Sequence, residues 1–148
     1  MRVARFALIM WSFAVPLAAR ETVGTFATWA VFCDEPKKCF AISEPAERTR
    51  HPFLSVAVAG ATLRVQAHLG RPARAARLTI GDAEFPLVMS GEEAAADPRT
   101  SRRIVTAMRS GESATLVGTS PRGGRFRHHY LLAGAPSAVD AAAVASLR

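Results

Sequence analysis

The feature that most constrains the fold is a series of short runs, beginning at residue 25, in which apolar and polar side chains alternate. A period of two is typical of β-strands that bury one face, and the Gly, Pro and Asp residues between the runs are typical of turns. We therefore predict strands at 25–33, 38–43, 53–59, 62–69, 77–80, 83–89, 113–120 and 125–132. Because Pro86 removes a backbone N–H from one of these runs, we expect that strand to lie at an edge or to carry a bulge.

Two segments have helical rather than alternating patterns. The first spans 101–110 and is followed by Gly111, a residue type that often ends helices, and the second is the Ala-rich segment 136–147. Their apolar stripes consist of Ile104, Val105 and Met108 in the first helix and of Val139, Ala143 and Leu147 in the second. Segment 90–99 contains Gly and Pro and is predicted to be a loop. About eight short strands and two short helices predict a mainly β fold, either a β-sandwich or a flattened barrel.

The start of the chain differs from the rest. Arg2 and Arg5 precede an uncharged apolar run over 6–19 that ends in small residues, which is the pattern of a secretory signal peptide. A retained membrane anchor is the alternative, although a membrane-spanning helix needs about 20 apolar residues. We predict cleavage near Ala19 and one domain over 20–148 with no transmembrane span, located in the periplasm, at the outer membrane or outside the cell. A chain of 148 residues, 49% of them hydrophobic, is large enough for one such domain and too small for two.

The chain has two cysteines, Cys33 and Cys39, at the mouth of the first predicted hairpin. If they face each other there, Phe32 and Phe40 pair on the opposite face of the hairpin. Because an exported chain meets oxidising conditions, we predict a disulfide that stabilises the fold by about 2 kcal/mol. A zinc site would need two further ligands, and the four histidines do not have paired spacing. A redox pair would have two intervening residues rather than five.

No catalytic motif stands out in the sequence. It contains neither a Gly-x-Ser-x-Gly elbow nor a His-Glu-x-x-His motif. His128 and His129 are adjacent on a strand, so we expect a partly buried His128, a solvated His129 and no shared metal. Two pairs of loop carboxylates have no obvious partner, namely Asp34 with Glu35 and Glu92 with Glu93. We therefore predict a protein without enzymatic activity, metal or cofactor; a small enzyme with a site assembled from loops is the alternative.

The chain is basic, with 19 Lys and Arg against 12 Asp and Glu. The candidate contact residues for an anionic partner are Arg71, Arg74 and Arg77, in a region without acids, and Arg125 and Arg127, on the strand face opposite Phe126. Arginine suits phosphate and carboxylate polymers such as lipopolysaccharide or anionic lipid. A secretory signal and the lack of an aromatic stacking strand argue against nucleic acid. The alternative is an Arg-rich surface that only keeps the protein soluble.

Two ordered groups of motifs resemble the invasion-associated locus B family of exported proteobacterial proteins. The first group is WAVFC at 29–33 followed by KCFAIS at 38–43, similar to that family's early tryptophan, cysteine pair and following strand. The second group is IVTAMRSG at 104–111, GTSPRG at 118–123 and YLLAG at 130–134. The resemblance covers most of the chain after the signal peptide and is weakest between 44 and 99.

The resemblance implies a β-sandwich-like fold, a periplasmic or envelope location and, in some pathogens, a link to entry into host cells. It implies no catalytic residues, and only Cys33 and Cys39 carry over as family positions. We therefore expect an exported, non-enzymatic protein that acts through surface contacts with anionic envelope components or other envelope proteins. Binding of an anionic envelope polymer is a mechanism compatible with that role.

Overall fold

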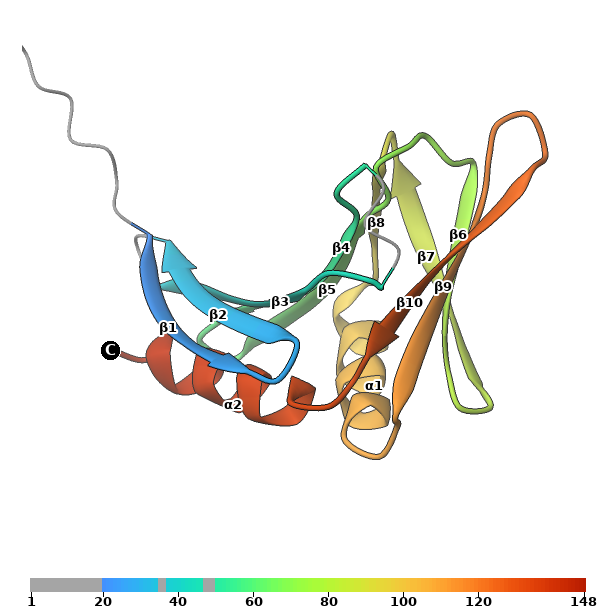
Figure 1. The fold of residues 1–148 in the computed structure, drawn as a ribbon. Coiled ribbons are helices and arrows are strands. Elements are labelled where there is room, and N and C mark those ends of the chain that lie inside the picture. The colour runs from blue at the N-terminus through green and yellow to red at the C-terminus, as the bar shows by residue number, and fades with distance from the viewer. Residues whose placement is uncertain (1–19, 35–36, 47–49) are drawn as a thin grey trace, which may run out of the picture.

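The computed structural model describes residues 20–34, 37–46 and 50–148, so the predicted signal peptide at 1–19 lies outside the described residues. Within these ranges the chain forms ten strands and two helices (Figure 1). The strands are β1 (Glu21–Phe26), β2 (Trp29–Asp34), β3 (Lys38–Ser43), β4 (Phe53–Ala59), β5 (Thr62–His68), β6 (Ala75–Ile80), β7 (Ala83–Ser90), β8 (Glu93–Ala95), β9 (Ser113–Thr119) and β10 (Arg125–Leu131). The helices are α1 (Pro98–Met108) and α2 (Ala135–Ala145).

All ten strands belong to one antiparallel sheet, in the order β1-β2-β3-β4-β5-β8-β7-β6-β9-β10. The sheet bends into a first half, β1 to β5, and a second half, β6, β7, β9 and β10 (Figure 1). The short strand β8 joins the halves, since it pairs with β5 on one side and with β7 on the other. The edge strands β1 and β10 are not neighbours in this order, so the sheet is not closed into a barrel. The predicted mainly β fold is confirmed, and it is consistent with a β-sandwich of ten rather than about eight strands.

The two additional strands come from segments whose sequence signals are weak. The predicted strand at 25–33 is two strands, β1 and β2, joined by a turn in which Ala27 has a φ of 52° without being glycine. Strand β8 lies in the segment 90–99 that we predicted to be a loop. Its three residues are too few to show an alternating pattern, and pairing on both sides satisfies its backbone hydrogen bonds.

Helix α1 packs mainly against β5, at the bend of the sheet. It begins at Pro98, three residues before the predicted start, because Asp97 caps it: the backbone N–H of Thr100 donates to the Asp97 carboxylate at 2.9 Å. This hydrogen bond and that from the Thr100 hydroxyl lower the pKa of Asp97. The predicted apolar stripe is confirmed, since the three residues Ile104, Val105 and Met108 are buried.

Helix α2 covers the inner face of β1 to β4 (Figure 1). Its predicted apolar stripe is only partly correct, because Val139 is buried with Ala138 and Ala142 whereas Leu147 is 72% exposed beyond the end of the helix. The small alanine side chains let the helix lie close to the sheet, above Trp29 and its neighbours. None of the helices in the described residues is long and apolar enough to cross a membrane.

The disulfide hairpin has the predicted register. Cys33 lies opposite Cys39, with an S–S distance of 2.03 Å, and Phe32 lies opposite Phe40. Cys39 is fully buried on the face that α2 covers, whereas the two phenylalanine rings stack on the other face with centroids 5.3 Å apart. The disulfide therefore ties β2 to β3 at the end of the first half, away from the bend.

The end of β10 lies against the first half of the sheet and connects the two halves by hydrogen bonds. The indole Nε1–H of Trp29 donates to the backbone carbonyl of Leu131 at 2.9 Å. The backbone N–H of Ala46 donates to the backbone carbonyl of His129 at 3.2 Å. Gly134 then begins α2 with a φ of 86°, and a Cβ at this position would lie 2.2 Å from the carbonyl oxygen of Phe26. The close approach of α2 to β1 therefore requires glycine here.

Candidate functional site: the outer face of β6, β9 and β10

Strand alternation separates two sets of side chains in the second half of the sheet. His128 and Tyr130 of β10 are buried on the inner face, as are Leu78 of β6 and Leu116 of β9. The residues between them point outward to solvent. His129 is exposed, as predicted, whereas His128, which we predicted to be partly buried, is buried.

The register places two of the candidate arginines in one row across three strands. Arg77 of β6 pairs with Val117 of β9, and Val117 pairs with Arg127 of β10. Because neighbouring strands lie about 4.8 Å apart, the backbones of Arg77 and Arg127 are separated by roughly 10 Å. Two long side chains that start at this separation on one face can contact the same anionic polymer.

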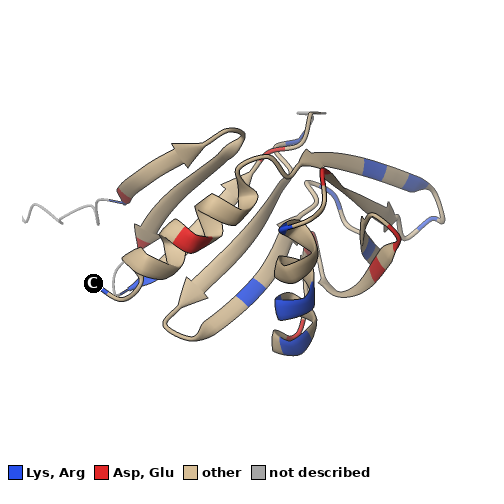
Figure 2. Cartoon of the chain, turned by 90° about the horizontal axis from the view of Figure 1, so that it is seen from below, with Lys and Arg blue, Asp and Glu red and all other residues tan. Residues whose placement is uncertain are grey.

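Arg125 extends this cationic surface by one row. It pairs with Thr119 of β9, two residues from Val117, so its side chain points to the same face as that of Arg127. We call the surface formed by Arg77, Arg125 and Arg127 the basic face. Figure 2 shows cationic positions recurring along the β9–β10 hairpin and around α1.

An ion pair involves one arginine of the basic face, and a hydrogen bond lies beside the face. Arg77 Nη1 lies 3.1 Å from Glu84 Oε2 of β7, with both side chains at least half exposed. In the next row, the Thr115 hydroxyl and His129 Nδ1 form a hydrogen bond of 3.1 Å. Arg77 is therefore held in place by one acid, while its exposed guanidinium remains accessible to a polymer.

The remaining two candidate arginines are placed differently. Arg74 is exposed at the end of the basic face, where its backbone N–H donates to the carbonyl of Thr119 at 2.8 Å. Arg71 stacks over the ring of Phe126, 4.8 Å from its centroid, and that ring lies over Gly118 on the inner side of the sheet. The structure therefore brings Arg77, Arg125 and Arg127 together, sets Arg74 beside them and separates Arg71 from them.

A second cationic cluster surrounds α1, and part of it is engaged in packing. Arg103 lies over the ring of Phe85, 5.5 Å from the centroid. Arg109 Nη2 lies 2.6 Å from Asp140 Oδ1 of α2. This hydrogen bond, together with the opposite charge, raises the pKa of Arg109, and the hydrogen bond lowers the pKa of Asp140. Both arginines are exposed, but Arg103 already contacts an aromatic ring and Arg109 an acid.

Three of the four predicted loop carboxylates have partners that the sequence did not indicate, and the fourth, Glu35, lies outside the described residues. Asp34 pairs with Arg20 at 3.3 Å. Glu93 forms a short hydrogen bond with His68 Nδ1, and Glu92 lies 3.8 Å from the other ring nitrogen. In the described part of the chain, no group of three His, Cys, Asp or Glu residues is arranged to hold a metal ion.

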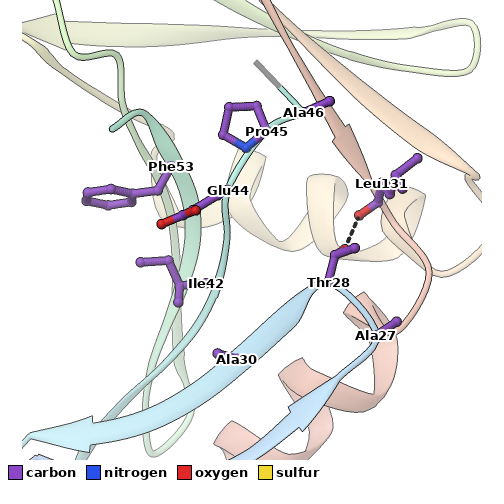
Figure 3. Close-up of a pocket in the computed structure, with 9 residues that line it drawn as sticks. All are labelled: Ala27, Thr28, Ala30, Ile42, Glu44, Pro45, Ala46, Phe53 and Leu131. Atoms are coloured by element: carbon purple, nitrogen blue, oxygen red, sulfur yellow. Dashed lines mark hydrogen bonds between the residues drawn. The ribbon is translucent and has the colours of Figure 1, made fainter. Parts of the chain in front are cut away.

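An open groove of about 540 Å³ lies on the outer face of the first half, at the junction with β10 (Figure 3). It is lined by Thr28, Ala30, Ile42, Glu44, Phe53 and Leu131, among others. Ile42 and Phe53 come from β3 and β4, and Leu131 reaches the groove from β10, where its carbonyl also accepts a hydrogen bond from Thr28 Oγ1 at 3.4 Å. The sequence pattern did not identify this groove, although it did place Phe32 and Phe40 on the same outer face.

Comparison with solved structures identifies a related fold. The crystal structure of invasion associated protein B from Bartonella henselae is similar with a TM-score of 0.64, covering 86% of this chain and 99% of that chain at 19% sequence identity. At this identity the similarity concerns the fold. No protein-family model matches the sequence, and neither does any curated protein.

Proposed function

We propose that this is an exported, non-enzymatic envelope protein of the invasion-associated locus B type, and that it binds an anionic envelope polymer through the basic face. The observation that carries the proposal is the row across β6, β9 and β10, which sets Arg77 and Arg127 on one exposed surface with Arg125 beside them. The similar fold of the Bartonella henselae protein supports the family assignment. The apolar start of the sequence supports export.

The chemistry of the basic face favours a repeating phosphate or carboxylate ligand. Guanidinium groups form paired hydrogen bonds with such groups, and three of them on one sheet face offer several contact points without enclosing a small molecule. The attraction acts between exposed charges, so added salt must weaken it. Association with host cells would follow from contacts with anionic polymers at the cell surface.

The test is binding of the purified protein to lipopolysaccharide at low and at moderate salt. We expect the triple variant Arg77→Gln, Arg125→Gln, Arg127→Gln to bind at least about tenfold more weakly at low salt, because three charge-assisted contacts are lost. The control is Arg99→Gln, Arg102→Gln, Arg103→Gln, which removes the same charge from α1 and leaves the basic face intact. Equal losses in the two variants, or binding that salt does not weaken, would contradict the proposal.

A further inference from the structure

We propose that the outer face of the first half binds a single acyl chain with an anionic end, such as a fatty-acid anion. The site consists of the groove of Figure 3 together with the adjoining rings of Phe32 and Phe40, and we call it the aromatic groove. It lies in a different half of the sheet from the basic face, so this proposal does not depend on the proposed function.

The β2 and β3 side chains on the floor of the aromatic groove are apolar. Ala30 pairs with Ile42 in the row that lines the groove, and Phe32 pairs with Phe40 in the next row of the same face. All four side chains are only half-buried, although they lie on the face of the sheet opposite α2. A sheet face that only contacts water normally carries polar side chains, so contiguous apolar side chains here indicate a binding surface.

One end of the aromatic groove is cationic. The guanidinium of Arg20 lies over the Phe32 ring, 5.3 Å from its centroid, and the Lys38 ammonium lies over the Phe40 ring at 5.2 Å. Arg64 of β5 lies in the same row as the two phenylalanines, because Phe40 pairs with Ala57 of β4 and Ala57 pairs with Arg64.

The nearby carboxylate of Asp34 pairs with Arg20, which leaves Lys38 and Arg64 to give this end an excess of positive charge. The other end carries Glu44. This polarity matches a ligand that has one anionic end and an apolar body.

The dimensions fit an extended chain rather than a compact molecule. From Lys38 to Glu44, β3 and the residue after it span roughly 20 Å at about 3.3 Å per residue. The groove volume of about 540 Å³ is within the range of small-molecule sites. An acyl chain can lie along β3 with its anionic end at Lys38 and its tail between Phe53 and Leu131.

The backbone of the sheet favours an acyl chain over a peptide. The floor strands β2, β3 and β4 each have a hydrogen-bonded neighbour on both sides, so their backbone groups are already paired within the sheet. A peptide lying on this face would leave its own N–H and C=O groups without partners, which is costly in an apolar groove. A hydrocarbon chain has no such groups.

The first experiment is calorimetric titration of the purified protein with dodecanoate below its micelle concentration. We expect one dodecanoate per protein and affinity at least about tenfold weaker for dodecyltrimethylammonium, whose chain is the same but whose charge is opposite. Equal affinity for the two ligands, or no dodecanoate binding, would contradict the proposal.

Variants then test the two parts of the aromatic groove. Ile42→Glu places a carboxylate on the floor and should weaken dodecanoate binding at least about tenfold. Lys38→Glu should weaken it severalfold, whereas Lys37→Glu, the same charge change at the neighbouring position, should stay within about twofold. Val144→Glu, at an apolar side chain of α2 that is 55% exposed and lies on the opposite side of the sheet, controls for added charge. Equal losses of dodecanoate affinity in Lys37→Glu and Lys38→Glu, or an unchanged affinity in Ile42→Glu, would contradict the proposed site.

Amide chemical shifts of the wild-type protein provide a test that does not depend on whether a variant folds. Dodecanoate should shift the amides of β2 and β3 around Ala30 and Ile42 and leave those of Arg77 and Val117 in place. Shifts confined to the second half would contradict the proposal. A short peptide of alternating Leu and Asp that shifts the groove amides, where dodecanoate does not, would show that the ligand is a peptide instead.

Discussion

The two halves of the sheet bury the same kind of inner face but leave different outer faces. In the second half the outward side chains of β6, β9 and β10 are mostly polar, with arginine, threonine and histidine around the single Val117 of the central row. In the first half the outward side chains in the middle of β2 and β3 are alanine, isoleucine and phenylalanine, with Asp34 and Lys38 at the hairpin end. Both faces belong to one continuous sheet that bends at β8.

The two outer faces therefore need different explanations. The second half is stable with its outer face in water and needs no ligand for that. The clustering of charges on this face is the observation that suggests a partner. The first half keeps apolar side chains outside although α2 already covers its inner face. Binding of a ligand would therefore remove more apolar surface from water on this outer face than on that of the second half.

The largest expected effect comes from breaking the connection between the halves at Gly134. Gly134→Ala puts a Cβ 2.2 Å from the Phe26 carbonyl oxygen and forces an alanine to a φ of 86°. We expect a loss of about 3 kcal/mol in the free energy of unfolding, measured by urea titration. The control is Gly60→Ala, which has a φ of 58° with no atom within 4 Å and should lose about 1 kcal/mol. Equal losses would mean that the approach of α2 to β1 does not matter.

Opening the disulfide should weaken the first half most. Replacing Cys33 and Cys39 by alanine avoids a buried hydroxyl at Cys39, and we expect a loss of about 2 kcal/mol from the entropy of the unfolded chain. Hydrogen exchange should accelerate more at β2 and β3 than at β9 and β10, because local opening of the hairpin also becomes easier. Two free thiols in the protein purified under oxidising conditions would disprove the disulfide, and equal acceleration in both halves would disprove its local effect.

The smallest effect concerns the ion pair between the two helices. Arg109 lowers the pKa of Asp140, so the pair stabilises the folded state above the usual titration range of aspartate, and this contribution is lost as the pH falls through the lowered pKa. Because the side chains are 49% and 60% exposed, Asp140→Asn should cost only a few tenths of a kcal/mol at neutral pH. The difference from wild type should vanish in acid. Asp82→Asn, in the exposed β6–β7 turn, is the control and should change stability at neither pH.

Sequence patterns predicted the fold where alternation and turn residues agree. The disulfide hairpin has the predicted register down to the pairing of Phe32 with Phe40. The split at Ala27 could not be predicted, because its positive φ occurs without the glycine or asparagine that usually marks such a turn. The start of α1 had an overlooked signal, since Asp97 followed by Pro98 is typical of a helix N-terminus.

The candidate site depends on strand order, which local patterns do not contain. Alternation correctly turned Arg125 and Arg127 outward. It could not show that β6 pairs with β9. This pairing places Arg77 on the same face as Arg125 and Arg127, although Arg77 and Arg127 are 50 residues apart in the sequence. Arg71 was grouped with Arg77 because they are close in sequence, but the ring of Phe126 holds it on the other side of the sheet.

The place of α2 in the chain affects the order in which the protein can fold. The first half of the sheet ends at His68, but the helix that covers its inner face spans Ala135–Ala145. A chain that emerges from the ribosome by its N-terminus therefore exposes the apolar side chains of Trp29 and Leu54 until the residues of α2 have emerged. Contacts this distant in sequence form slowly, and uncovered sheet surfaces aggregate. We expect the nascent protein to require a holding chaperone until its last helix docks.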